Sequence, residues 1–338
     1  MAAEIRVLRR RIRSVESTKK ITKAMELIAA SRIVRAQNRM RNARPYAQEI
    51  RRALEQLSSD RTLEHPMLTG VENPRRAGIL VVTSDRGLAG GYNANALRRA
   101  NELAERLSGE GKEIERYIIG RKGVVYYRFR QIELAGAWTG FSEQPNFTDA
   151  RAATDAIVAA LSATSEGEIT SGEREGKPGI DELWIVFTRF VNSVTQTPVA
   201  IQAAPVNSDA EDDSEVGLDD DERSANRSDD SDGRGNEDGD SDRERAAGSY
   251  EFEPEPAQLI GALLPRYVSS RIFSALLESA ASESAARRRA MKSASDNATE
   301  LIKTYTRLAN QARQAEITQE ISEIVGGADA LASAGSEQ

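Results

Sequence analysis

Apolar positions near the start of the chain follow a helical repeat. The first of them are spaced by three and four residues: Ile5, Leu8, Ile12 and Val15. This spacing is typical of the narrow apolar seam of a coiled coil. The seam continues in smaller side chains, and Pro45 is the only helix breaker along it, where it either kinks or ends the helix. We therefore expect a long helix over residues 1–60.

A second helical pattern covers the other end of the chain, over residues 257–334. It is clearest after Pro265, and Gly326 and Gly327 are the first residues to interrupt it. Its apolar positions again step by three and four: Ala298, Leu301, Tyr305, Leu308, Ala312 and Ala315. A helix of ~60 residues is about 90 Å long, which favours a coiled coil over an ordinary globular helix. Neither seam has enough large apolar side chains to be stable alone, so we expect the two end helices to pair antiparallel.

Between these helices, the pattern alternates between strands and helices. Continuous apolar runs predict buried strands, and the last predicted strand is expected to pair with its neighbour: Gly78–Thr83, Ile114–Ile119, Leu183–Phe190 and Thr195–Ala204. Helical patterns fall between them at residues 94–107, 122–129 and 148–163. The order predicts a Rossmann-like α/β domain over residues 75–207 with a partly parallel sheet. The expected fold class is thus α/β plus a long antiparallel coiled coil.

Two polar stretches interrupt this plan. Residues 165–180 are polar and glycine-rich, and we interpret them as a flexible loop. Residues 208–248 are rich in Asp, Ser, Arg and Gly and contain almost no apolar side chains. Such a composition cannot bury enough surface to offset the entropy of ordering, so we predict an acidic disordered insert.

Charge is distributed unevenly along the chain. The formal net charge is −7, but residues 208–247 alone contain 17 Asp and Glu against 5 Arg. Residues 1–59 contain 15 Lys and Arg against 5 Asp and Glu, so the acidic insert hides a basic first helix. The basic residues surround the helix without interleaved aromatic side chains. Composition alone leaves open a solvated helix surface, an acidic protein partner or a nucleic acid.

The side chains that most catalytic sites need are scarce. The chain has no cysteine and a single histidine, His65, which we interpret as a surface loop residue. These counts exclude thiol chemistry and disulfides and argue against a multi-histidine metal site. Glu320 and Glu323 could share a helix face, but ordinary surface carboxylates explain them better. No stretch approaches the ~18 apolar residues of a membrane-spanning helix. We expect no cofactor, no metal and no enzymatic activity of the chain by itself.

A glycine-rich segment, SDRGLAGGYN at Ser84–Asn93, follows the first predicted strand and precedes a helix. Phosphate-binding loops occupy this position in other folds. The segment lacks the Gly-Lys-Ser/Thr of a P-loop and the G-x-G-x-x-G of a dinucleotide site. A tight turn that uses glycine for its backbone geometry is the better interpretation.

Four segments together resemble the gamma subunit of F-type ATP synthases, of the bacterial type. They lie in the family's order and cover almost all of the chain outside the two polar stretches: Ile12–Gln37, Thr83–Asn93, Ser270–Ala298 and Ile317–Ala330. The last matches the family's C-terminal signature position by position: Ile317, Thr318, Glu320, Glu323, Gly327, Ala328 and Ala330. Some photosynthetic members carry a regulatory cysteine pair near the acidic insert, which this chain lacks.

The resemblance implies a role and a set of partners. The two end helices would form the shaft inside a ring of three alpha and three beta subunits. The α/β domain would sit with the epsilon subunit on the ring of c subunits. Rotation of that ring would force the catalytic sites through different nucleotide affinities and release ATP. Four positions would match those that contact acidic loops of the beta subunits: Lys23, Met25, Arg287 and Gln319.

Further expectations follow from this resemblance. The chain would bind no nucleic acid and no small-molecule substrate of its own. It would be peripheral to the cell membrane, on the cytoplasmic side, and held there through the c ring. The Arg-rich start is interpreted as mature protein, because the apolar seam runs through it. The alternative is a coiled-coil scaffold without a rotary function, which explains the helices but not the C-terminal signature.

Overall fold

The computed structural model describes residues 2–58, 65–172, 174–206 and 256–335. It comprises two compact units. One is formed by residues 31–286, and the other combines residues 1–30 with residues 287–338. The acidic insert predicted at 208–248 lies outside the described residues.

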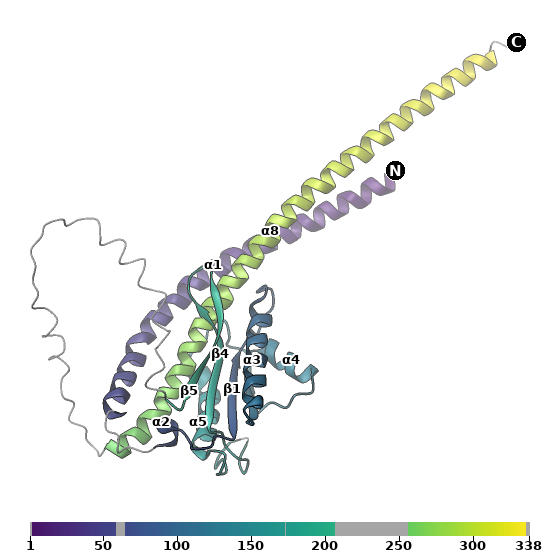
Figure 1. The fold of residues 1–338 in the computed structure, drawn as a ribbon. Coiled ribbons are helices and arrows are strands. Elements are labelled where there is room, and N and C mark those ends of the chain that lie inside the picture. The colour runs from purple at the N-terminus through teal and green to yellow at the C-terminus, as the bar shows by residue number, and fades with distance from the viewer. Residues whose placement is uncertain (1, 59–64, 173, 207–255, 336–338) are drawn as a thin grey trace, which may run out of the picture. The chain divides into compact units, whose positions relative to one another are not determined.

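The chain alternates helices and strands in its middle and has a long helix at each end (Figure 1). Its elements are α1 (Ala2–Ser58), α2 (Pro66–Thr69), β1 (Arg76–Val82), α3 (Tyr92–Gly109), β2 (Glu113–Ile119), α4 (Arg121–Phe129), β3 (Gly136–Trp138), α5 (Phe147–Ala163), β4 (Glu182–Phe190), β5 (Gln196–Ala204) and α8 (Pro256–Gly335).

The unit formed by residues 31–286 is built on a five-stranded sheet in the order β3-β2-β1-β4-β5. The first four strands in that order are parallel to their neighbours, and β5 returns antiparallel beside β4. β1 is therefore central, and its residues are buried on both faces, as its uninterrupted apolar run predicts. The parallel strands with crossover helices confirm the predicted Rossmann-like α/β domain.

Side chains alternate between the two faces of the sheet along β1. Ile79 and Val81 face α3 and α4, where they join a core that includes Leu103 and Tyr127. Leu80 and Val82 face the opposite layer and join the core of α5. Because side chains of a strand alternate in direction, one apolar run supplies both cores.

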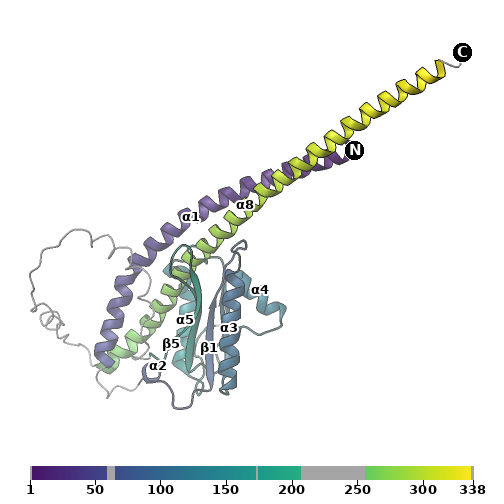
Figure 2. The ribbon, with the colours of Figure 1, turned by 45° about the horizontal axis from the view of Figure 1, so that its top comes forward.

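The end helices also contribute to the second of these cores. Ile50 and Leu54 of α1 belong to the same buried cluster as Ile260 and Leu264 of α8. Figure 2 shows these parts of α1 and α8 side by side. The later part of α1 and the first part of α8 therefore belong to the α/β unit, and are not only arms of a coiled coil.

The loop at residues 165–180 is tied to the sheet. The carboxylate of Asp181 accepts hydrogen bonds from the backbone N–H groups of Ser165 (2.8 Å), Arg75 (2.8 Å) and Arg76 (3.0 Å). Burial would raise the pKa of Asp181, but these three hydrogen bonds outweigh it, so its pKa lies below the ordinary value. The sequence predicts a flexible connection here, whereas the structure gives its ends a defined set of contacts.

A second tie is ionic. Arg174, in the middle of the loop, donates to both oxygens of Glu115 on β2, at 2.6 and 3.1 Å, and Arg76 pairs with the same carboxylate. Two guanidinium groups on one largely buried carboxylate compensate for its desolvation. The pKa of Glu115, which burial alone would raise, is therefore lowered.

Several boundaries differ from those that the sequence predicts. Pro45 lies inside α1 and Pro265 lies inside α8, so neither proline ends its helix. α8 begins at Pro256, one residue before the predicted start at residue 257, although its helical pattern is clearest only after Pro265. Two short elements, α2 and β3, were not predicted, because three or four residues carry too little periodicity to be recognised. His65, expected in a surface loop, is half-buried and caps α2 by accepting a hydrogen bond from Met67 N–H.

Candidate partner-binding surfaces

The outer parts of α1 and α8 pair antiparallel in the unit formed by residues 1–30 and 287–338. The Thr22 hydroxyl lies 2.7 Å from the Ser295 hydroxyl, and the Arg11 guanidinium lies 6.0 Å from the centre of the Tyr305 ring. From the first pair to the second, the residue number falls by 11 on α1 and rises by 10 on α8. This opposite progression confirms the predicted antiparallel pairing of the end helices (Figures 1 and 2).

Small and polar side chains dominate the seam between these helices. Its buried members include Ile5, Leu8, Thr22, Ala29, Met291, Ser295 and Ala298. Two of the expected seam residues are exceptions, since Leu301 is 46% exposed and Leu308 is 39% exposed. Their neighbours Ile302 and Ala309 are half-buried instead. The prediction of an inward Leu301 and Leu308 was wrong, because a three-and-four spacing fits two adjacent stripes of a helix equally well.

The C-terminal part of α8 extends beyond the start of α1. In the register above, a residue of α1 and its partner on α8 have numbers that sum to about 317, so residues after about 315 have no α1 residue opposite them. About 20 further helical residues follow, which corresponds to about 30 Å of single helix. Figure 1 shows this end of α8 continuing past the N-terminus.

This single-helix end carries an exposed apolar stripe. Ile317, Ile321 and Ile324 are 44%, 56% and 71% exposed, and their i, i+4, i+7 spacing places them on one face. Ten of the seventeen exposed large hydrophobic side chains in the described part of the chain belong to this unit, which is far smaller than the other. Exposed apolar side chains gathered in this way indicate a surface that a partner covers.

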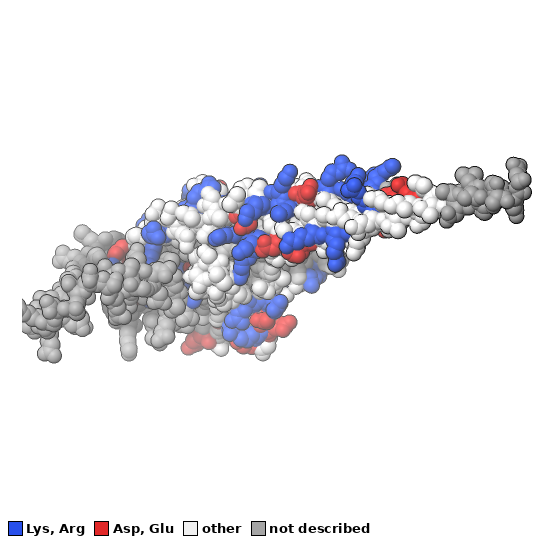
Figure 3. Space-filling view, turned by 90° about the horizontal axis from the view of Figure 1, so that it is seen from above, with Lys and Arg blue, Asp and Glu red and all other residues white. Residues whose placement is uncertain are grey.

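The same unit is strongly basic. Residues 4–30 and 287–326 contain 15 Lys and Arg against 8 Asp and Glu. In the view from above, blue side chains follow the described parts of the end helices, with fewer red ones among them (Figure 3). A positive potential along a narrow rod attracts acidic surfaces more strongly than neutral ones.

The four residues predicted to contact beta subunits occupy different environments. Lys23 is exposed and pairs with Glu26 at 3.1 Å, and Met25 is half-buried. Arg287 is only 4% exposed, and by the register it lies about 10 Å along the axis from the level of Lys23. Gln319 is exposed on the single-helix end and donates to Glu323 at 2.9 Å. The structure therefore brings Lys23 and Met25 near Arg287 but leaves Gln319 far from all three.

The C-terminal signature lies entirely in the last part of α8. Ile317, Thr318, Glu320 and Glu323 are exposed, and the Thr318 hydroxyl donates to the carbonyl of Gln314. For Gly327, Ala328 and Ala330 the structure describes the helical backbone only. The helical spacing puts Glu320 and Glu323 near each other on the surface, as ordinary helix carboxylates.

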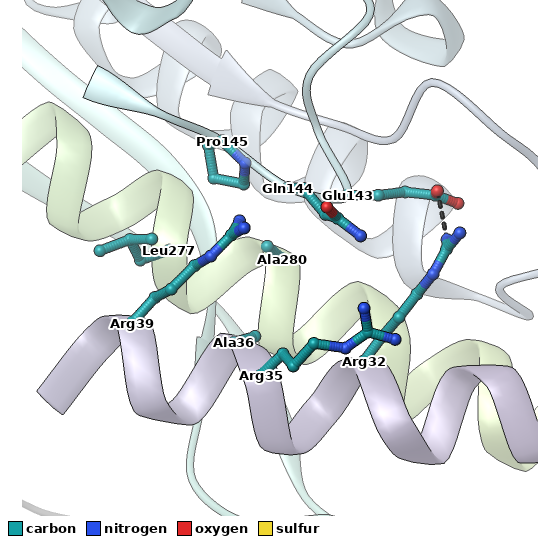
Figure 4. A pocket seen from close by; sticks show the side chains of 9 residues that line it. All are labelled: Arg32, Arg35, Ala36, Arg39, Glu143, Gln144, Pro145, Leu277 and Ala280. Carbon is teal, nitrogen blue, oxygen red and sulfur yellow. Dashed lines mark hydrogen bonds and ion pairs between the residues drawn. The ribbon is translucent and has the colours of Figure 1, made fainter. Parts of the chain in front are cut away.

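A small arginine-lined cleft lies between α1 and the loop after β3. Arg32, Arg35 and Arg39 reach from one side of α1 towards Glu143, Gln144 and Pro145, above Leu277 and Ala280 of α8 (Figure 4). Arg32 pairs with Glu143, which Arg86 also approaches at 3.8 Å. The enclosed space is about 10 Å³, enough for about one water molecule. The cleft is therefore a basic surface feature and too small for a nucleotide.

The polar groups of the glycine-rich turn form hydrogen bonds within their own domain. The Asp85 carboxylate accepts from the backbone N–H groups of Arg121 (3.0 Å), Gly140 (2.8 Å) and Ser142 (3.0 Å). An internal carboxylate thus lies at the N-terminus of α4, where a phosphate would bind in a nucleotide site. Gly90 has a φ of 57°, which glycine adopts without strain. These contacts favour the interpretation as a structural turn.

Two further findings concern sites of other kinds. Among the described residues, no group of three or more His, Cys, Asp or Glu side chains could hold a metal ion. None of the described helices is both long and apolar enough to cross a membrane.

Sequence reasoning missed some residues that position these surfaces. The role of Asp85 and the clamp of Arg174 on Glu115 join segments that are far apart in the chain. No local pattern marks such pairs. The helical spacing of the C-terminal isoleucines could have indicated a shared face, but its exposure follows only from the register with α1, which begins at Ala2.

Comparison with known proteins identifies the family. The family model described as ATP synthase matches residues 4–331. The gamma chain of ATP synthase from Frankia casuarinae is 52% identical, over 98% of this chain and 99% of its own length. The gamma chains from Saccharopolyspora erythraea and Salinispora tropica are 50% and 51% identical, over 99% and 100% of this chain and the whole of each relative.

Solved structures share the fold at much lower identity. A chain in the structure of the Euglena gracilis mitochondrial ATP synthase that comprises OSCP, F1 and the c-ring has a TM-score of 0.58 at 15% identity, covering 98% of this chain and 95% of that one. A chain in the rotor of the same enzyme has a TM-score of 0.53 at 15% identity, covering 94% and 100%. These two likenesses concern the fold alone, whereas the full-length identity of about half to the bacterial relatives concerns the whole chain. On this evidence the chain belongs to the family of ATP synthase gamma chains.

Proposed function

We propose that this chain is the central-stalk rotor subunit of an F-type ATP synthase. It couples the ion-driven rotation of a c ring to conformational changes at the catalytic sites of the beta subunits, which produce ATP. The observation that carries the proposal is the single-helix end of α8, which exposes Ile317, Ile321 and Ile324 beyond a basic two-helix section. A chain that stayed alone in water would gain nothing from this stripe, whereas an apolar sleeve inside a ring of subunits would cover it.

The proposed partners follow the two kinds of surface. Three alpha and three beta subunits surround the paired helices, and the basic side chains face acidic loops of the beta subunits. Lys23, Met25, Arg287 and Gln319 are the proposed contacts. Lys23, Met25 and Gln319 are at least partly exposed. Arg287 is 4% exposed, so a partner would contact either its small exposed surface or the residues beside it. The α/β domain associates with the epsilon subunit and the c ring.

The proposed mechanism is mechanical. The chain contributes no catalytic group. A shaft that is not symmetric presents different faces to the three beta subunits as it turns. Each face stabilises a different conformation of its neighbour, so rotation shifts the populations of states with different nucleotide affinity. The ion is proposed to be the proton. The chain is held at the cytoplasmic side of the cell membrane through the c ring, and it has no cofactor, nucleic acid or small-molecule substrate of its own.

The proposal is tested by co-expression with the alpha and beta subunits, followed by native mass spectrometry. The expected species contains one copy of this chain with three copies of each partner. Replacing Ile317, Ile321 and Ile324 together with serine is expected to reduce its yield. Replacing Gln311 and Gln314, which are exposed on the same helix, with serine is the matched control. A homodimer, or an unassociated chain, would refute the rotor and favour the coiled-coil scaffold.

A further inference from the structure

Eight consecutive residues of α8, Ser279–Ala286, are buried without exception. At about 100° per residue, eight residues point in all directions around a helix axis. A helix at the surface of a domain has one exposed stripe, whereas this segment has none. Seven of the eight side chains are Ala or Ser, so the surrounding residues approach the helix backbone closely. We call this part of α8 the collar segment.

The first wall around the collar segment is the glycine-rich turn before α3. Ala89 of this turn and Tyr92, the first residue of α3, form a buried cluster with Ala286. The Tyr92 hydroxyl donates a hydrogen bond to the carbonyl of Ser279 at 3.4 Å. Ser279 and Ala286 are seven residues apart, so they lie on nearly the same side of α8. The tyrosine side chain therefore lies along one face of the helix over two turns.

The second wall comes from the end of β4 together with α1. Phe190 is buried with Ala281 and Ala285 of the collar segment and with Ile33 and Ala36 of α1. Ala281 and Ala285 lie about 200° and 240° around the axis from Ser279. The phenylalanine ring and the tyrosine ring thus contact well-separated faces of the same helix.

The third wall is the loop after β3 with the arginines of α1. Gln144 and Pro145 lie over Ala280, which is about 100° from Ser279, and over Leu277 just before the collar segment (Figure 4). Asp85 ties this loop to the glycine-rich turn through Ser142. The walls are therefore joined to one another and to the sheet, and they surround α8 on all sides.

We propose that Tyr92 and Phe190 are positioning residues that lock α8 against rotation within the α/β domain, so that torque enters the shaft at the collar segment. The inference rests on the proposed rotor function and adds where the coupling occurs. Apart from Glu283, the collar segment has only small side chains, so by itself it resists turning less than the preceding part of α8, where Leu264 and Ile272 are buried in the core of the domain. Two aromatic side chains wedged against different faces prevent such turning, because a turn of even one residue would drive them into neighbouring helix atoms. From the collar segment, α8 continues without interruption to its C-terminal end.

The experiment uses the whole complex in proteoliposomes, with Tyr92→Ala and Phe190→Ala in this chain. Under an imposed ion gradient, ATP formation and ion flux are measured together at equal amounts of assembled complex. We expect less ATP per ion translocated in both variants, because the collar segment and the helix after it would twist relative to the domain. Tyr127→Ala is the control, since Tyr127 is equally buried but its cluster lies on the other face of the sheet and contains no residue of α8. Unchanged ATP per ion in both collar variants would overturn the inference.

A second measurement tests the inference even if the Tyr92→Ala and Phe190→Ala complexes fail to assemble. The chain has no cysteine, so Ala89→Cys with Ala286→Cys introduces a single pair that a short bifunctional thiol reagent can bridge. A locked collar predicts that bridging leaves ATP synthesis unchanged and that it restores coupling in the Phe190→Ala background. Loss of ATP synthesis on bridging would show that α8 must move within the domain, which contradicts the inference.

The two proposals fail in different ways. A complex prepared without this chain that still couples ion flux to ATP synthesis would refute the rotor function itself. A wild-type complex that couples normally, with collar variants that match the Tyr127→Ala control, would refute only the collar.

Discussion

The α/β domain and the outer paired helices bury their side chains in opposite ways. In the domain, strands such as β1 and β4 are covered on both faces, and residues such as Leu80 and Ile185 have no exposed surface. In the outer unit, the seam between the helices is narrow, and Leu301 and Ile324 face solvent. The domain holds its structure through its own core. The outer helices leave much of their apolar surface to be covered by something else.

This difference fits the proposed rotor function. A domain that transmits force must keep its shape, so it needs a core that resists deformation. A shaft that fits inside other subunits must be slim, so it has room for only a thin seam of Ala, Ser and Thr. Thr22 and Ser295 illustrate the consequence, since a buried hydroxyl pair occupies a place where an ordinary coiled coil has leucines. The comparison leads to four predictions, from the largest effect to the smallest.

The largest effect is expected from a cavity in the sheet. Ile185→Ala removes a fully buried side chain at the centre of β4 and should lower the free energy of unfolding of the domain by about 2–5 kcal/mol. Both tryptophans, Trp138 and Trp184, lie in strands of this domain, so their fluorescence during urea unfolding reports on it alone. A change below about 1 kcal/mol would mean that the core relaxes around the cavity, against close packing.

A smaller effect is expected from the tie of the 165–180 loop. Asp181→Asn replaces a carboxylate that accepts three backbone hydrogen bonds, and should cost about 1–3 kcal/mol at neutral pH. The pKa of Asp181 is lower in the folded state, so the carboxylate stabilises the fold above its unfolded pKa, and this contribution disappears as the pH falls through the folded pKa.

The measurement is urea unfolding of wild type and Asp181→Asn over a pH series. The gap between the two should be widest at neutral pH and shrink as the pH falls below the ordinary Asp value of 3.8. A gap that stays constant down to acid pH would show that the charge contributes nothing and that only the shape of the side chain matters.

The next effect concerns the thin seam. Thr22→Val leaves the buried Ser295 hydroxyl without its partner and should cost about 1 kcal/mol. Ser295→Ala should cost less, because the Thr22 hydroxyl still donates to the carbonyl of Lys19 at 3.1 Å, and the double variant should cost less than the sum of the two. Hydrogen exchange of peptides from residues 4–30 and 287–326 measures this unit directly, and tryptophan fluorescence of the domain should not change. Strictly additive costs would show that the two hydroxyls are not coupled.

The smallest effect on stability is expected at the exposed end. Ile324→Ser changes a side chain that is 71% exposed, so the isolated chain should lose no more than about 0.5 kcal/mol. The same substitution should weaken assembly with the alpha and beta subunits, which native mass spectrometry measures. If Ile324→Ser destabilised the isolated chain as strongly as Ile185→Ala, the stripe would be part of a fold of this chain and not a surface for a partner.

Much of the architecture could be predicted from local patterns. The run at Gly78–Thr83 indicated a strand covered on both faces, and β1 is that strand. The repeat that begins at Ile5 indicated a coiled-coil helix, and Ile5 and Leu8 are buried in its seam. The C-terminal signature at Ile317–Ala330 indicated the family, which the full-length relatives confirm. These features depend on residues close together in the chain, where period and residue type leave few alternatives.

Other features could not be predicted in this way. Leu301 and Ile302 both fit an apolar helix face, and only the position of α1 decides that Leu301 is exposed. From the sequence, Asp85 is an ordinary turn residue; the fold brings three N–H groups from two separate segments to its carboxylate. Arg287 would be expected at the surface from its residue type, yet it is 4% exposed. In each case the deciding neighbour is distant in sequence.

The sequence by itself determined the longer elements, their order and the family, because helix period, strand burial and a long signature depend on residues close together in the chain. The tertiary structure alone decided three features: the antiparallel register, in which paired residue numbers sum to about 317, the single-helix end of α8 beyond Ala2 of α1, and the enclosure of Ser279–Ala286 by three walls. A register is a difference of small energies summed over two whole helices, and an enclosure needs parts of the chain that are far apart in the sequence. No single residue indicates the register or the enclosure, so neither could be predicted from the sequence alone.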